Sequence, residues 1–195
     1  GSKFCGRKGL RGNMSVSEQL FEIIKEKSFK YSETAEFKLA SGQMSNYYFD
    51  CKMTLLDPAG LRLIGKAVYE KIKNIDADGI GGLTLGADPI AISTSLAALE
   101  DGRILYPLIV RKEPKGHGTQ KYIEGHVSKV KKAIVLDDVI TTGASTIKAI
   151  ERMRAEGIDI KIACVIIDRE ENDGKTNIVN MGVDVIPLFK KTDFK

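Results

Sequence analysis

Short apolar runs alternate along the chain with segments whose apolar residues recur at helical spacing. The runs predict strands, and the segments between them predict amphipathic helices. The strands are expected from residue 79, at 104–110, from 133, at 160–167 and at 183–189; the helices are expected at 16–27, from 58 to 72, up to 99, and from about 147 to 157. Strands that alternate with helices form a doubly wound, mostly parallel α/β sheet, whose ligand site lies at the carboxyl edge. Pro187 places the last strand at a sheet edge.

The strand that starts at Ala133 ends in two adjacent carboxylates, Asp137 and Asp138. The residues that follow are Val139, Ile140, Thr141, Thr142, Gly143, Ala144 and Ser145. Backbone N–H groups at the start of a helix favour a bound phosphate, and carboxylates suit sugar hydroxyls or hydrated Mg²⁺. The segment therefore predicts a site for a ligand that carries a phosphate and a diol, such as a ribose 5-phosphate. An ordinary strand-to-helix turn with an Asp cap is the alternative.

A basic segment follows the strand at 104–110 directly. Its cations gather within seven positions: Arg111, Lys112, Lys115 and His117. Glycines and Pro114 exclude a regular helix in residues 111–125, so this segment is expected to be a lid or a linker. Cations beside a strand end would bind a polyanion, whereas a solvated charge run is the alternative.

Composition narrows the class of protein. A chain of 195 residues fits one domain, and we expect residues 14–195 to form it, with residues 1–13, which are rich in glycine and basic residues, as a tag or leader. The net charge of +4 is too mild to indicate a nucleic-acid partner. No apolar run approaches the roughly 20 residues needed to cross a membrane. Three cysteines without metal-ligand spacing favour a reducing cytoplasm. The glycine-rich residues 79–89 lack Gly-x-Gly-x-x-Gly spacing, so a dinucleotide site is unsupported.

Residues 133–146 resemble the PRPP-binding motif of the type I phosphoribosyltransferases, and their Asp-Asp-Val-Ile-Thr-Thr-Gly is most similar to the orotate phosphoribosyltransferases. Two further segments carry the same resemblance. Phe-Lys-Leu-Ala-Ser-Gly-Gln-Met-Ser-Asn-Tyr-Tyr-Phe, within residues 36–50, resembles a hood over the pyrimidine. Arg-Lys-Glu-Pro-Lys-Gly-His-Gly, within residues 111–125, resembles the flexible catalytic loop. The resemblance implies the type I fold with a small hood.

The chain departs from the family pattern at two positions. Some bacterial members have a lysine where Ala40 stands; Lys38 would lie on the same side of a strand as Ala40, so whether it substitutes is open. Some relatives also place a lysine where Gly86 stands, which would leave only backbone donors to a pyrophosphate.

The resemblance also assigns roles to individual residues. It implies that residues 137–145 bind PRPP, with Asp137 and Asp138 supporting Mg²⁺ directly or through water. It implies that Arg111, Lys112, Lys115 and His117 act on pyrophosphate, and that Lys112 reaches the site of the neighbouring subunit in a homodimer. Orotate is expected to contact Thr141, Arg169, Tyr48 and Phe49. For Arg169 the alternative is a surface salt-bridge cluster with Glu170, and for the aromatics it is a role in the core.

The reaction that the resemblance implies converts orotate and PRPP into orotidine 5′-monophosphate (OMP) and pyrophosphate, a step of de novo pyrimidine biosynthesis. The catalytic residues expected from the loop and the motif are Lys112, Lys115, His117, Asp137 and Asp138. A phosphoribosyltransferase for purines or uracil and a non-catalytic PRPP-sensing regulator are the alternatives. The hood and loop motifs together disfavour the first, and the short N-terminal segment disfavours the second because it leaves no room for a nucleic-acid-binding module.

Overall fold

A six-stranded sheet forms the centre of the computed structural model, which describes residues 14–38, 42, 44–114 and 121–194. In sheet order the strands are β10 (Asp184–Lys190), β9 (Asp159–Asp168), β8 (Lys132–Ile140), β5 (Gly79–Leu83), β6 (Tyr106–Val110) and β7 (Ile123–Glu124). All neighbours pair in parallel except β6 and β7. The doubly wound parallel sheet expected from the sequence is confirmed, and β10 lies at an edge as Pro187 predicts.

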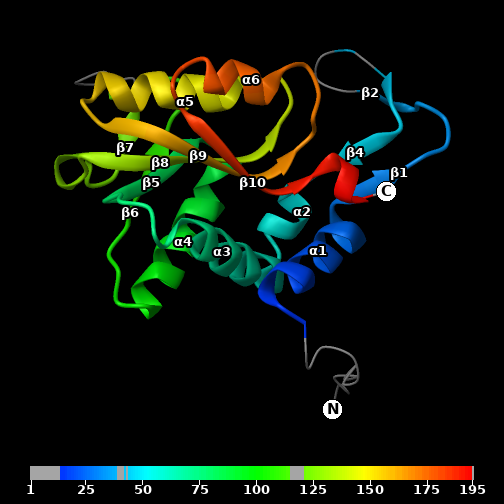
Figure 1. The fold of residues 1–195 in the computed structure, drawn as a ribbon, viewed down its shortest axis with the longest axis horizontal. Helices are drawn as coiled ribbons and strands as arrows, with labels where there is room; N and C mark the ends of the chain where they lie inside the picture. The colour runs from blue at the N-terminus through cyan, green and yellow to red at the C-terminus, as the bar shows by residue number, and fades with distance from the viewer. Residues whose placement is uncertain (1–13, 39–41, 43, 115–120, 195) are drawn as a thin grey trace.

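Helices cover both faces of this sheet (Figure 1). On one face lie α1 (Val16–Lys27), the short α2 (Lys52–Leu55), α3 (Pro58–Ile72) and α4 (Ala87–Glu100); on the other lie α5 (Ala144–Ala155) and α6 (Gly174–Val179). Alternate side chains of β8 enter two separate cores. Ile134 and Leu136 pack on the side of α3 and α4, whereas Ala133 and Val135 pack on the side of α5. The same alternation directs the side chains of Asp137 and Asp138, farther along β8, to opposite faces.

Local capping explains two helix starts. The Ser15 hydroxyl accepts the Glu18 N–H, and the Glu18 carboxylate accepts the Ser15 N–H, which closes a capping box on α1. Asp57 accepts the N–H groups of Ala59 and Gly60 at the start of α3, with Pro58 as its first residue. Both helices have the bounds expected from the sequence.

The hood is built from four short strands. β1 (Phe29–Tyr31) pairs antiparallel with β4 (Tyr47–Phe49), and β2 (Phe37–Lys38) pairs with β3 (Met44–Ser45). The C-terminal 3-10 helix η2 (Lys191–Phe194) lies beside it (Figure 1). Phe194 is buried, and its ring lies 5.1–5.3 Å from the rings of Phe29 and Phe49. The end of the chain is thereby packed into its N-terminal segment.

Some predicted boundaries were wrong. The helix expected from about Ile147 begins at Ala144, because Gly143 adopts φ +78° and turns the chain into the helix directly. The strand expected from Ile104 begins at Tyr106, and β8 continues past both aspartates to Ile140. Neither α6 nor η1 (Val127–Lys129) was predicted, and β7 forms within the segment expected to be an irregular loop.

Gly82 allows the tightest contact between β5 and its surroundings. A Cβ atom there would lie 2.0 Å from the Leu136 carbonyl oxygen and 2.7 Å from the Ala87 Cβ. Because the first of these is backbone of a central strand, it has little freedom to move.

We predict that Gly82→Ala lowers the free energy of unfolding by more than about 2 kcal/mol, since overpacking a rigid core costs about 1–3 kcal/mol. Gly182→Ala is the matched control, because Gly182 has φ +72° with no atom within 4 Å, so that only backbone strain of about 1 kcal/mol is expected. Urea unfolding measures both variants, and a smaller loss for Gly82→Ala than for Gly182→Ala would contradict the packing argument.

Candidate active site at the carboxyl edge of the sheet

The strand order reverses between β5 and β8. From β5 the chain passes to β6 on one side, and it then returns to β8 on the other. Crevices at such a reversal, outside the carboxyl ends of the strands, are the usual ligand sites of open α/β sheets. The turn after β5 meets β8 there: a Cβ atom on Gly86 would lie 2.7 Å from Asp138 Oδ1. A side chain at position 86 would therefore displace the Asp138 carboxylate, which gives a reason for glycine at this position.

Asp137 is a buried structural carboxylate. Only 5% of it is exposed, and it points toward α5, as the alternation of β8 requires. Its Oδ2 accepts the Thr146 hydroxyl at 2.6 Å, and its Oδ1 accepts the Asp138 N–H at 3.0 Å. Burial, and then the charge of Asp138, raise the pKa of Asp137 to about 7, although the hydrogen bond from Thr146 opposes this rise.

Asp138 lies on the opposite side of β8, toward the turn after β5. It is partly exposed, and its Oδ1 accepts the Val139 N–H at 2.9 Å. The two carboxylates that the sequence predicts as a pair therefore have different surroundings, although they remain close enough for each to affect the other. Asp138 is the one that solvent or a ligand can reach directly.

The turn at residues 141–145 forms the amino end of α5. The Ala144 N–H donates to Thr142 Oγ1 at 3.3 Å. Within the part of the chain that the structure describes, the N–H groups of Thr142, Gly143 and Ser145 have no protein acceptor. N–H groups without a protein acceptor at the start of a helix of 12 residues form a favourable site for an anion.

Residues of α6, which the sequence did not indicate, pack against this turn and support it. A Cβ atom on Gly174 would lie 2.1 Å from the Thr141 carbonyl oxygen, and the Asn177 amide donates to the Thr142 carbonyl at 3.1 Å. Both residues belong to α6, more than 30 residues along the chain. No local sequence pattern predicts this contact between α6 and the turn. The sequence contains only one hint of it, which is a glycine at the start of a helix.

The turn after β5 is held by a hydrogen bond of its own. The Thr84 hydroxyl donates to Asp88 Oδ2 at 2.6 Å, and the peptide bond between Thr84 and Leu85 is cis. Burial raises the pKa of Asp88, and this hydrogen bond opposes the shift. Gly86 occupies the cap position of α4, and Asp88 lies inside the helix.

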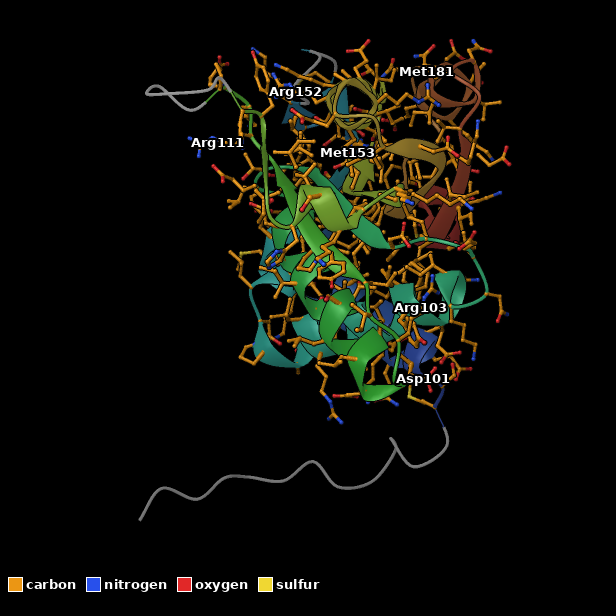
Figure 2. The ribbon with its side chains drawn as sticks, turned by 90° about the vertical axis from the view of Figure 1, so that its left-hand side faces the viewer. Asp101, Arg103, Arg111, Arg152, Met153 and Met181 are labelled. Carbon is orange, nitrogen blue, oxygen red and sulfur yellow. The ribbon has the colours of Figure 1, made fainter. Side chains whose placement is uncertain are left out.

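The basic segment is anchored at its two ends by Arg152 of α5 (Figure 2). The guanidinium donates to the carbonyls of Arg111 and Lys112, the second at 2.9 Å, and it lies 4.0 Å from the centre of the Tyr122 ring. Arg111 pairs with Glu124 at 3.1 Å, so its charge is partly balanced, whereas the Lys112 side chain is exposed. Lys115 and His117 lie outside the described residues.

Arg169 directly follows β9, the neighbour of β8, and is 5% exposed. Its Nη2 lies 3.4 Å from both the Ser45 hydroxyl and the Tyr47 carbonyl of the hood, and its Nε lies 3.0 Å from Glu171. The sequence alternative of a surface salt bridge with Glu170 is wrong, because Arg169 is buried and its partner is Glu171. Burial of a guanidinium beneath a hood is a suitable arrangement for a planar acid.

The two predicted aromatics occupy different faces of β4. Phe49 is buried in the aromatic core, with its ring centre 6.0 Å from the Arg169 guanidinium carbon. Tyr48 stacks on Phe37 at 5.7 Å. Lys38, on β2, pairs with Met44 on β3. Ala40 lies outside the described residues, so it stays a prediction that Lys38 substitutes for a lysine at position 40.

The described residues contain no group of three or more His, Cys, Asp or Glu side chains that could hold a metal ion. Asp138 offers one accessible carboxylate. A hard cation such as Mg²⁺ fits this place if its other ligands are water and substrate oxygens, which is its usual mode of binding.

Comparison with known proteins identifies the relatives of this chain. Residues 54–190 match the model of the phosphoribosyl transferase domain. The chain is 44% identical over 180 residues to an orotate phosphoribosyltransferase of Aquifex aeolicus, covering 92% of this chain and 98% of that protein, and 43% identical to one of Leptospira biflexa. Solved structures of Mycobacterium tuberculosis orotate phosphoribosyltransferase are similar with TM-scores of 0.79 (29% identity, in complex with Fe(III) dicitrate) and 0.75 (26% identity, in complex with PRPP); each covers 92% of this chain and 99% of its own.

The raised pKa of Asp137 predicts a pH-dependent stability. An acid whose pKa rises on folding contributes stability that is present below its ordinary pKa of 3.8 and is lost as pH rises toward 7. We expect Asp137→Asn to lack this loss, so that its melting temperature, relative to the unchanged protein, rises between pH 4 and 8.

Melting curves in buffer without divalent cations measure this difference. Asp184→Asn, which removes an exposed carboxylate from β10, is the control and should show no such trend. Parallel pH profiles for the unchanged protein and Asp137→Asn would contradict the buried-carboxylate account.

Proposed function

The chain belongs to the phosphoribosyl transferase family, and we propose that it transfers the 5-phosphoribosyl group of PRPP to orotate. The N1–C1′ bond forms as the bond from C1′ to pyrophosphate breaks, giving orotidine 5′-monophosphate and pyrophosphate in de novo pyrimidine biosynthesis. The relatives at 43–44% identity are named orotate phosphoribosyltransferase, after this reaction. The observation that carries the proposal is the pairing of an anion-binding turn after β8 with a buried arginine at the end of the adjacent strand β9.

The turn at residues 141–145 suits the 5-phosphate. Its unpaired N–H groups and the dipole of α5 stabilise negative charge, and the contacts from α6 keep the turn rigid. Asp138 is the group suited to the ribose hydroxyls. Asp137 then acts by holding β8 against α5 through Thr146, which is a positioning role and differs from the direct contact that the sequence predicts.

Arg169 suits the base. Orotate is an anion with a planar carboxylate, and a buried guanidinium recognises such a group strongly. Because orotate is already anionic, the reaction needs little help from a general base. Catalysis is then mainly positioning and stabilisation of the charge that develops on pyrophosphate.

The basic segment suits the leaving group. Lys112 is exposed and its backbone is fixed by Arg152, so its ammonium is available to a polyanion. We include Lys115 in the same role, with His117 as a proton donor to pyrophosphate. When bound, Mg²⁺ would neutralise charge on pyrophosphate; Asp138 is the residue suited to support it.

We also propose a homodimer in the cytoplasm. Ile92, Leu96 and Leu99 are exposed at helical spacing along α4, and exposed Ile104 follows. An apolar stripe of this kind favours burial against a second copy. We propose that Lys112 of each copy serves the site of the other. The free, buried Cys51 and Cys164 are compatible with a reducing compartment. None of the helices in the described part of the chain is long and apolar enough to cross a membrane.

Substrate choice tests the proposal. With PRPP and magnesium, the protein should consume orotate, which is measured by the loss of orotate absorbance. It should leave adenine, hypoxanthine and uracil unchanged, which is measured by product release. Turnover of another base alone would contradict the role of Arg169, and PRPP binding without any turnover would favour the regulator.

Subunit mixing tests the shared site. Lys112→Ala and Arg169→Ala should each be nearly inactive alone, and the mixture should regain up to about one quarter of the activity, because hybrid dimers contain one intact site. A mixture that stays inactive despite demonstrated subunit exchange would show that Lys112 serves its own subunit.

A further inference from the structure

Three charged side chains form a chain of ion pairs beneath the hood. Glu171 lies between two cations: its Oε2 is 3.0 Å from Arg169 Nε, and its Oε1 is 3.0 Å from Lys191 Nζ. Arg169 is 5% exposed, and the side chains of Glu171 and Lys191 are each 20% exposed. Partly buried charges are screened less than fully exposed ones, so each one affects the others and any ligand beside them.

Arg169 is held loosely by its neutral partners. Its contacts with Ser45 and Tyr47 measure 3.4 Å, which is long for charge-assisted hydrogen bonds. Arg169 Nε and Glu171 Oε2 are both buried and make no well-aligned hydrogen bond within the described residues, although they lie 3.0 Å apart. The guanidinium therefore retains capacity for an acidic ligand.

The third charge is placed by the end of the chain. Phe194 fixes η2 in the aromatic core, and the Thr192 N–H donates to Glu170 at 3.3 Å. Lys191, at the start of η2, consequently reaches Glu171, and its ammonium lies 5.7 Å from the centre of the Tyr47 ring. The C-terminal segment thus contributes a charge to the base site although it is remote in sequence from Arg169.

We propose that Glu171 and Lys191 set the charge that Arg169 presents to the base, and thereby act as specificity-determining residues for a carboxylated pyrimidine. This inference rests on the proposed function. Glu171 keeps Arg169 in position, but its negative charge offsets the positive charge of Arg169. Lys191 in turn offsets the charge of Glu171, so the three side chains together carry a net charge of +1. This net charge attracts orotate, which is an anion, and does not attract neutral uracil.

The sign of this charge makes the inference testable with variants of similar size. Glu171→Gln raises the net charge of the group to +2 and should lower the KM for orotate. Lys191→Met reduces the net charge of the group to zero and should raise the KM for orotate. For one charge at this depth we expect changes of about three- to tenfold in opposite directions, larger at low salt. The KM for PRPP should stay within about twofold, because its site lies after β8.

Two further variants separate charge from structure. The double variant Glu171→Gln with Lys191→Met restores the net charge of +1 and should bring the KM for orotate back toward that of the unchanged protein. Glu170→Gln removes the neighbouring carboxylate, which pairs with Lys190 at 4.0 Å and does not touch Arg169. It should change the KM for orotate much less than Glu171→Gln.

Steady-state kinetics at two salt concentrations distinguish the outcomes. Opposite shifts with recovery in the double variant support the inference. Shifts in the same direction, equal shifts in the KM values for both substrates, or an effect of Glu170→Gln as large as that of Glu171→Gln would overturn it while leaving the proposed function in place. A lack of orotate turnover by the unchanged protein would instead overturn the proposed function.

Discussion

The site depends on a geometric constraint, the alternation of side chains along β8. Because this strand lies between two layers of helices, successive residues must serve opposite faces. Asp137 is thereby directed into the α5 layer, where Thr146 binds it, and Asp138 is directed to the turn after β5. One strand thus fixes the turn at residues 141–145 with one carboxylate and leaves the other accessible. A one-residue shift in the register of β8 would exchange these two roles.

Close backbone contacts make the same edge rigid. Gly82, Gly86 and Gly174 each stand where a side chain would meet β8, Asp138 or the turn at residues 141–145. Arg152 contacts the basic segment near its start and near its end from α5. The groups that we propose for phosphate, sugar and leaving group are therefore positioned by the central strands and by α5, whereas the proposed base site is assembled from β9, the hood and the end of the chain.

Much of this arrangement could be predicted from the sequence. Apolar runs and helical spacing located the central strands and most of the longer helices, and the Asp-Asp and Thr-Thr-Gly pattern located the carboxyl edge. What could not be predicted were contacts between residues far apart along the chain. Gly174 against Thr141, Arg152 against Lys112 and Lys191 against Glu171 have no periodic signal, because each depends on packing that only the folded chain brings about. The early start of α5 was missed because threonine and serine favour turns, whereas Gly143 ends the turn at once.

A crystal structure with orotidine 5′-monophosphate would test the central claim most directly, since this product carries both the phosphate and the carboxylated base. The account predicts the phosphate at the N–H groups of residues 142–145 and the base carboxylate at the Arg169 guanidinium, with Glu171 still paired to Lys191. A phosphate bound elsewhere, or a base that does not contact Arg169, would contradict it.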